Sequence, residues 1–288
     1  SPRTPWGCVM RERLAEVWKG LKREKGAMIG LGLIVCVVLM ALAAPLAPYS
    51  PTKRDVATGT AGPSSEHLLG TDKNSFDVFS RMLYGARTSL LTGLAAIALA
   101  LLIGVPLGAV SGYWRSWPDA VLMRIVDVML AFPSIVLAIA IAAVLGKSVS
   151  SVIVAVGAVN IPIVARQVRA SVLQVRETDY VVAARSLGFS TPRVLLRHVL
   201  PNCLAPIIVL STLGVGFAIL SAAGLNFLGL GPEPRTPEWG VMLARVSNHI
   251  RNGEWWIYVP PGAAIAATVL GFNLLGDGLR KALDPRAR

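Results

Sequence analysis

Hydrophobic residues lie in long uncharged runs along this chain, separated by short polar segments. The first run falls between Lys25 and Lys53, and it predicts a membrane-spanning helix at 27–47. About 20 residues rising ~1.5 Å each are enough to cross a hydrocarbon core of ~30 Å. Similar runs predict five further spans, at 89–111, 127–145, 149–165, 204–225 and 257–276. The pattern therefore predicts an all-α polytopic membrane protein with six transmembrane helices.

Two features inside these spans carry structural expectations. Gly104, Gly108 and Gly112 recur every four residues, and small residues on one helix face allow a close approach of another helix in lipid. Packing within this chain is the favoured use, ahead of dimerisation. Asp127 stands at a span end, where a carboxylate is more often solvated or paired than part of a proton relay.

The polar segments divide the chain into five parts. We expect a basic tail at 1–26, which is either an amphipathic helix on the membrane surface or a simple tail. The first span is followed by a loop at 48–86 and then by a five-helix core at 87–276, and a second tail covers 277–288. Within the core we expect a loop at 113–126. Thr236 and Pro237 predict the start of a short helix that reaches Ile250 and lies at the membrane face.

The charge distribution predicts the orientation. The net charge is +12, although only 15% of the residues are charged and 54% are hydrophobic. On a six-span topology, 19 of the 28 Lys and Arg residues lie on the side that holds both termini and the segment 177–202. An excess of basic residues marks the cytoplasmic side, and basic residues there contact anionic lipid head groups. Nucleic acid is not needed to explain the charge.

Motifs for catalysis and for metal binding are absent from the sequence. Cys8, Cys36 and Cys203 are widely separated and the three His residues are scattered, which argues against a disulfide framework and a metal site. Gly146-Lys147-Ser148 lacks the earlier glycine and the βαβ context of a phosphate loop. The predicted spans hold almost no carboxylates, which disfavours transport coupled to protons or sodium. A translocation pore whose energy comes from another subunit fits better.

The polar, basic segment 177–202 has an ordered pattern. Tyr180, Ala183, Ala184 and Leu187 share one face of a short helix, and Gly188 follows where a helix commonly ends. Thr191 can cap a second helix with Pro192 at its first position. We therefore expect a helix at 178–187, a glycine corner, and a second helix at 192–200.

This segment resembles the EAA loop of ABC-importer permeases. Ala183, Ala184, Gly188, Leu200 and Pro201 stand in register with that pattern, whereas Val182 and His198 replace its usual Glu and Ile. The residues around them are similar to those of the C-type subunit in the peptide/nickel branch. Two further stretches resemble the same branch, with Phe76 and Asn226 as departures: Leu69-Gly70-Thr71-Asp72 leading to Gly85-Ala86-Arg87-Thr88-Ser89-Leu90, and Asn226-Phe227-Leu228-Gly229-Leu230-Gly231.

The resemblance implies a non-catalytic permease subunit in a bacterial cytoplasmic membrane that imports dipeptides or oligopeptides. It implies four kinds of partner: a second permease, two ATP-binding subunits that hold the ATP and magnesium, an extracytoplasmic substrate-binding protein, and lipid. No cofactor is expected on this chain itself. The residues that it assigns to contact with the ATPases are Asp179, Tyr180, Ala183, Ala184, Arg185, Leu187, Gly188, Leu200 and Pro201.

The resemblance also implies a division of labour in the loop. The first helix is gripped by the ATPases, with Arg185 or Asp179 pairing to them, Gly188 makes the corner, and the second helix passes the movement to the fifth span. Alternatives are a nickel or metal-chelate importer of the same branch, a stand-alone secondary transporter, and a scaffold or membrane enzyme. The lack of a His or Cys cluster favours peptides over nickel.

Overall fold

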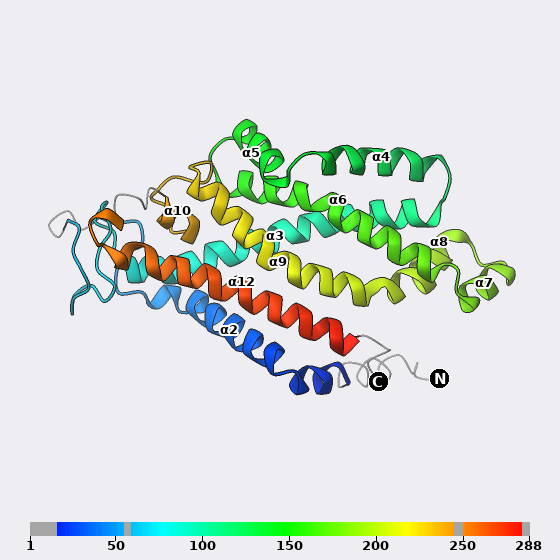
Figure 1. Cartoon of the computed structure of the whole chain (residues 1–288), viewed down its shortest axis with the longest axis horizontal. Coiled ribbons are helices and arrows are strands. Elements are labelled where there is room, and N and C mark those ends of the chain that lie inside the picture. Colours follow the sequence, from blue (N-terminus) through cyan, green and yellow to red (C-terminus); the bar gives the residue numbers. More distant parts are fainter. Residues whose placement is uncertain (1–15, 55–58, 245–249, 284–288) are drawn as a thin grey trace.

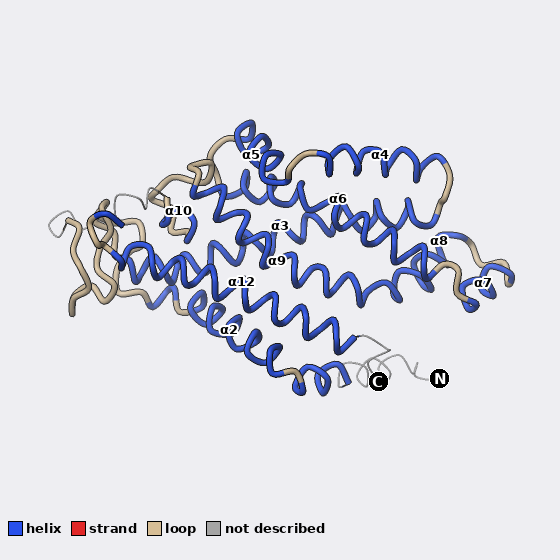
Figure 2. Tube along the Cα trace, in the orientation of Figure 1, coloured by secondary structure: helices blue, strands red, loops and turns tan. Residues whose placement is uncertain are grey.

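The computed structural model describes residues 16–54, 59–244 and 250–283. These residues form an elongated bundle of helices that run along its long axis (Figure 1). Figure 2 shows helices and loops in the described part of the chain, where the only strand-like pairing is one isolated bridge between Thr71 and Asp77. The all-α fold predicted from the sequence is confirmed.

Five helices are long and apolar enough to cross a membrane. They are α2 (Lys25–Leu42), α3 (Val78–Tyr113), α6 (Val149–Val175), α9 (Leu204–Phe227, continuous with the turns from Thr191) and α12 (Trp255–Leu283). A sixth span arises if α4 (Trp117–Ala131) and α5 (Ser134–Leu145) cross together. Short elements complete the set: a 3-10 turn at Ala44–Leu46, α7 (Asp179–Ser186), α8 (Thr191–Val194), and α10 (Trp239–Leu243).

The third predicted span, 127–145, is not a single helix. It breaks between α4 and α5, whose axes differ by 94°. Pro133 explains the break, because a proline lacks the N–H for the helical ladder and drives the preceding residue out of the α region. Phe132 accordingly has extended dihedral angles, with φ −87° and ψ 139°.

The predicted loop at 113–126 is also wrong, because α4 begins at Trp117. Pro118 lies in the first turn of α4, where a missing N–H costs nothing. That proline was the available sequence signal for a helix start. The N-terminal tail is helical over 16–23, and Leu21 within it is buried.

Several helices extend past the predicted spans. α3 begins at Val78, α6 continues to Val175, and α12 continues to Leu283. Charged residues marked the predicted ends, yet a helix can continue beyond the apolar stretch with its own caps. At the start of α3 the Asp77 side chain accepts a hydrogen bond of 2.7 Å from the Ser80 amide.

The core of the bundle is the crossing of α3 and α6. A Cβ atom on Gly104 would lie 2.9 Å from the Ile161 carbonyl oxygen, and one on Gly112 would lie 2.8 Å from that of Arg169. Such distances leave no room for a side chain, so the glycines let the two backbones touch. The expectation that these glycines pack within the chain is confirmed. Asp127 is paired too, since it accepts a hydrogen bond of 2.6 Å from Arg166.

The two ends of the bundle differ in content. The first turns of α2 and the last turn of α12 lie side by side, joined by an ion pair of 2.8 Å between Lys281 and Glu24, and α7 lies at that same end (Figure 1). We call this the α7 end. The described parts of segment 47–77, which are residues 47–54 and 59–77, lie with α10 at the opposite end, which we call the α10 end.

Candidate functional site

The short helix predicted at 178–187 is present as α7, which spans Asp179–Ser186. Thr178 occupies the N-cap position, and its hydroxyl donates a hydrogen bond of 2.6 Å to the Val175 carbonyl. Asp179 lies in the first turn and Arg185 in the last. Both charges stabilise the helix, because the helix dipole favours acidic residues at its start and basic residues at its end.

Gly188 forms the predicted corner. Its φ of +80° is a left-handed conformation that suits glycine. The Gly188 amide donates to the Arg185 carbonyl at 2.9 Å, and the Phe189 amide donates to the Ala184 carbonyl at 3.3 Å. These two hydrogen bonds define a Schellman motif, which ends α7 sharply.

The predicted face of α7 divides between two sides of the helix. Ala184 is buried together with Val181, and both pack in the core cluster that includes Val194. Tyr180, Ala183 and Leu187 are exposed. Ala184 therefore packs α7 against its own chain, and its assignment to contact with the ATPases stays a prediction. The remaining three residues form an exposed, mainly apolar surface, which we call the α7 face.

The second predicted helix, 192–200, is irregular. Four α-helical residues at Thr191–Val194 lead into a π turn at Leu195–Val199 and a 3-10 turn at Leu200–Cys203. Pro201 accounts for part of this, because it has no N–H to continue the α ladder. The N-cap of the helical turn Thr191–Val194 is Ser190, one residue before the expected Thr191. Leu200 is partly buried at this joint, whereas Pro201 is exposed.

Aromatic contacts brace the corner from the α8 side. The Phe189 ring stacks on His198 with a centroid distance of 5.9 Å, and the Arg193 guanidinium lies 5.8 Å from the Phe189 ring. His198, where the EAA pattern has Ile, thus packs on the corner through its ring. These contacts connect the residue after Gly188 to the π turn that enters α9.

Arg176 and Tyr113 join the ends of α6 and α3, and Tyr113 also contacts α7; the sequence pattern gave no reason to single them out. Arg176 Nη1 donates a hydrogen bond of 2.7 Å to the Tyr113 carbonyl, at the end of α3. Arg185 lies over the Tyr113 ring, 5.0 Å from its centroid. Arg185 therefore has a partner within its own chain. Asp179 is exposed and forms no ion pair with a described residue. Arg176 also bonds Glu177 at 2.8 Å and holds the pKa of that carboxyl below its usual range.

A second polar contact ties α4 to α6 near the same end. Asp119 accepts hydrogen bonds of 2.7 Å from both Nε and Nη2 of Arg169, and a further one from Ser111. A bidentate pair of this kind fixes geometry as well as charge. It joins α3, α4 and α6 to one another. The sequence signal for this contact was Asp119, an acidic residue in the first turn of α4. It was missed because the segment was predicted to be a loop.

The α10 end contains a buried polar network around Glu238, which is only 2% exposed. Its carboxylate caps α10 by accepting from the Val241 amide at 2.8 Å. It also accepts from the Ser89 hydroxyl at 2.7 Å and from the Asn226 side chain at 2.6 Å. Glu238 is therefore the cap, in place of the predicted Thr236. The predicted helix to Ile250 ends at Leu243 here, and 245–249 lie outside the described residues.

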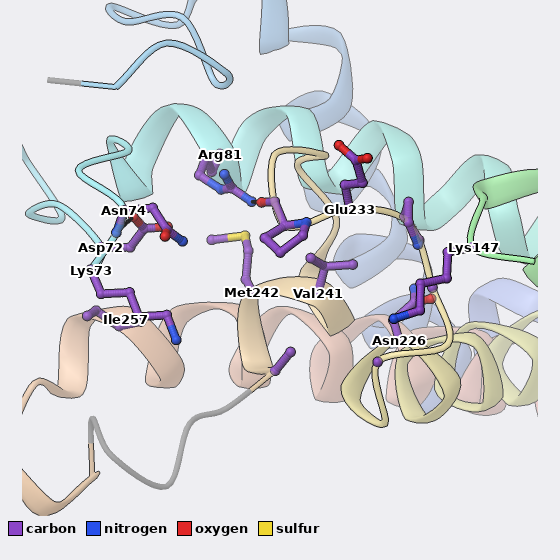
Figure 3. A pocket seen from close by; sticks show the side chains of 15 residues that line it. Asp72, Lys73, Asn74, Arg81, Lys147, Asn226, Glu233, Val241, Met242 and Ile257 are labelled. Atoms are coloured by element: carbon purple, nitrogen blue, oxygen red, sulfur yellow. Dashed lines mark hydrogen bonds between the residues drawn. The ribbon is translucent and has the colours of Figure 1, made fainter. Parts of the chain in front are cut away.

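A cavity of about 320 Å³ lies beside this network (Figure 3). Arg81 contributes from α3, Met242 from α10, Lys73 from segment 47–77, and Lys147 from the turn before α6. The described residues hold no group of three or more His, Cys, Asp and Glu side chains that could bind a metal ion. The cavity is lined by mixed apolar and charged groups.

Comparison with known proteins identifies the family. Residues 104–288 match the model "Binding-protein-dependent transport system inner membrane component". The chain belongs to this family. Residues 13–63 also match the model "N-terminal TM domain of oligopeptide transport permease C". The chain is therefore a permease subunit of an ABC importer and not itself an enzyme, which confirms the resemblance and excludes a stand-alone secondary transporter.

Curated relatives of this permease family match the chain over nearly its whole length. The "Dipeptide transport system permease protein DppC" of Alkalihalophilus pseudofirmus is 46% identical over 95% of this chain and 90% of that protein. The "Di/tripeptide transport system permease protein DppC" of Pseudomonas aeruginosa is 42% identical over 100% of this chain and 97% of that protein. The "Glutathione transport system permease protein GsiD" of Escherichia coli is 43% identical over 99% of this chain and 92% of that protein.

The fold also matches a solved structure. A chain of the MetNI methionine ABC transporter, crystallised in an inward-facing conformation, aligns with a TM-score of 0.50 and 17% identity. The alignment covers 65% of this permease and 96% of that chain. At this identity the likeness concerns the fold alone, and it agrees with the helical permease architecture.

Proposed function

We propose that this permease imports short peptides as one half of a two-permease pore, driven by two ATPases that seat on α7. A binding protein on the opposite side of the membrane delivers the peptide. The names of the relatives support the cargo, since those relatives transport dipeptides, tripeptides or glutathione. They favour peptides over nickel.

The α7 face is the observation that carries the coupling role. Leu187 is 78% exposed at the tip of the bundle. Tyr180 is 46% exposed, whereas its neighbour Val181 points into the bundle and is buried. Apolar side chains on a short, sharply ended helix suit insertion into a groove of another protein. The Schellman corner and the contact of Arg185 with the Tyr113 ring hold that helix at one angle to the bundle.

Movement of α7 has two routes into the bundle. One runs through Gly188, α8 and the π turn into α9, because these elements are continuous in sequence. The other runs through Arg185 and Arg176 to Tyr113, which ends α3. A rigid-body displacement of α7 therefore tilts α9 and α3 together, which is the kind of two-state change that alternating access requires.

The orientation follows from the same placement. We infer that the α7 end, with the start of α2 and the end of α12, faces the cytoplasm. The basic residues on that side, such as Lys25, Arg193, Arg197 and Arg280, support it by the positive-inside rule. The ATPases are then on the cytoplasmic side, and Asp179 and Arg197 are available to them.

A matched pair of exposed leucines tests the proposal. Leu187 precedes Gly188, and Leu228 precedes Gly229, and both helices end in the same pair of Schellman hydrogen bonds at opposite ends of the molecule. Leu187→Asp should abolish retention of the ATPase subunits when the permease pair is purified, because a charge cannot enter an apolar groove without cost. Leu228→Asp, at a residue that is 57% exposed, should leave retention unchanged.

The readout is the ratio of ATPase to permease after purification, followed by peptide uptake into proteoliposomes. Equal retention in wild type and Leu187→Asp would contradict the seating of the ATPases on α7. Full retention with no uptake of any di- or tripeptide by the wild-type complex would contradict the cargo.

A further inference from the structure

Arg81 is a buried cation with most of its hydrogen-bonding capacity unused. Its side chain is 1% exposed. Nη2 donates to the Pro234 carbonyl at 2.7 Å and to that of Thr236 at 3.2 Å, whereas Nε and Nη1 have no hydrogen-bond partner within the described residues. A buried guanidinium without a carboxylate partner is expensive, and buried polar groups are nearly always satisfied. The unused donors therefore call for a ligand.

The immediate surroundings of Arg81 do not supply the missing anion. The Phe76 ring lies 4.6 Å from the guanidinium and offers a cation–π contact, which leaves the in-plane donors free. Asp72 is the nearest acidic influence. One of its oxygens already accepts from the Asn74 and Phe76 amides at 2.8 and 3.0 Å. No ion pair joins Arg81 to a carboxylate in the described part of the chain.

The cavity beside Arg81 has the size and charge for a small anion. It measures about 320 Å³, within the range of roughly 300–1,000 Å³ that is typical of small-ligand pockets. Lys73 and Lys147 line it as well, and neither forms an ion pair with a described residue. Two carboxylates, Asp72 and Glu233, line the cavity too. Asp72 already accepts from backbone amides, and Figure 3 shows the Glu233 carboxylate pointing away from Met242 and Val241. The three cationic side chains therefore outnumber the carboxylates that line the cavity.

We propose that this cavity is a binding subsite for a small carboxylate, with Arg81 as the residue that binds it, and that the physiological ligand is the C-terminal carboxylate of a peptide in transit. A carboxylate accepts from guanidinium donors in short, charge-assisted hydrogen bonds. The depth of Arg81 favours a small molecule over a side chain of a docked protein, which would have to reach a guanidinium that is 1% exposed. The peptide identity rests on the proposed function, whereas the carboxylate chemistry does not.

A cysteine reporter inside the cavity tests binding without transport. Met242→Cys lines the cavity, and its modification by N-ethylmaleimide can be followed in the assembled transporter by peptide mass mapping, apart from the native cysteines. The probes are N-acetyl-alanyl-alanine, which has a free carboxylate, and its C-terminal amide. The acid should slow the labelling of residue 242, and the amide should not.

Variants of Arg81 then identify the group responsible. Arg81→Met should raise the acid concentration needed for half-protection by about tenfold or more, since it removes a charge-assisted contact. Arg81→Lys should retain part of the protection. Arg87→Met is the matched control, because Arg87 lies on the same helix, is exposed, and does not line the cavity.

The comparison of acid with amide needs no Arg81 variant, so it remains decisive if Arg81→Met does not fold. Equal protection by acid and amide, or none by either, overturns the proposal. Protection that requires the substrate-binding protein and no small ligand also overturns it. Protection by the acid in a transporter that moves no peptide would support the subsite and count against the proposed cargo alone.

Discussion

The α7 end and the α10 end of this permease are stabilised by opposite kinds of contact. At the α7 end, Val181, Ala184 and Val194 pack in an apolar cluster that extends to α3 and α6, and the charged contacts there are partly exposed to solvent. At the α10 end, Glu238 is buried and bonded to Ser89, which is 149 residues away in the chain. Trp239, fully buried, donates to the Met82 carbonyl at 3.1 Å.

This difference suggests a division between a part that moves and a part that holds. Local apolar contacts allow α7 and its corner to shift as a unit, because no buried charge is exposed when they do. The Glu238 network cannot slide without leaving a buried carboxylate or its donors unpaired. The α10 end therefore fixes α3, α9 and α10 to one another. In the proposed mechanism, a displacement that begins at α7 would pivot about it.

Removing the Glu238 carboxylate should have the largest effect on folding. Glu238→Val leaves three buried donors without their acceptor, from Ser89, Asn226 and the Val241 amide. Each unsatisfied donor costs about 1–3 kcal/mol, so a loss of about 3 kcal/mol or more is expected. The measurement is thermal unfolding of the purified permease together with its yield.

Glu238→Gln is the control for that variant. It keeps the size of the side chain and one acceptor oxygen, so it should fall between wild type and Glu238→Val. Equal thermal stability for Glu238→Val and wild type would remove the contrast between the two ends.

A glycine at the α10 end should give the second-largest effect. A Cβ atom on Gly231 would overlap the Asn226 side chain, which donates to Glu238. Gly231→Ala should therefore destabilise by about 1–3 kcal/mol, as overpacking does, by displacing Asn226. Gly262→Ala is the control, because a Cβ there would meet no atom within 4 Å. If both variants unfold at the same temperature, the network around Asn226 is looser than the structure indicates.

The sequence predicted the elements that depend on local pattern. Apolar runs located five long helices, and Gly188 predicted the corner because its position after Leu187 is a local signal for a left-handed turn. The glycines of α3 were assigned correctly to intrachain packing. Each of these rests on residues within a few positions of one another.

What the sequence did not predict depends on partners far along the chain. Glu238 was not singled out, because its role comes from Ser89 and Asn226, which are brought together by the fold. Tyr113 lay in an expected loop, so its contacts with Arg176 and Arg185 could not be anticipated. The predicted span 127–145, which contains Phe132-Pro133 in its first turns, looked continuous by composition, since hydropathy does not register the 94° bend.

The smallest expected effect on stability belongs to Gly188→Ala, and it separates stability from coupling. No atom would lie within 4 Å of a Cβ at Gly188, so the only cost is the left-handed φ of +80°, about 1–2 kcal/mol. Gly253→Ala is the matched control, because Gly253 has a φ of +72° and equal space at a turn before α12. Both variants should lower the unfolding temperature by similar amounts.

Only Gly188→Ala should reduce ATP hydrolysis stimulated by the binding protein and peptide, because it alters the angle at which α7 meets the ATPases. Gly188→Asn should restore much of that activity, since Asn tolerates the left-handed region better than Ala. Equal ATP hydrolysis in Gly188→Ala and Gly253→Ala would show that the corner serves stability only, and that α7 passes its movement through Arg185 and Tyr113 instead.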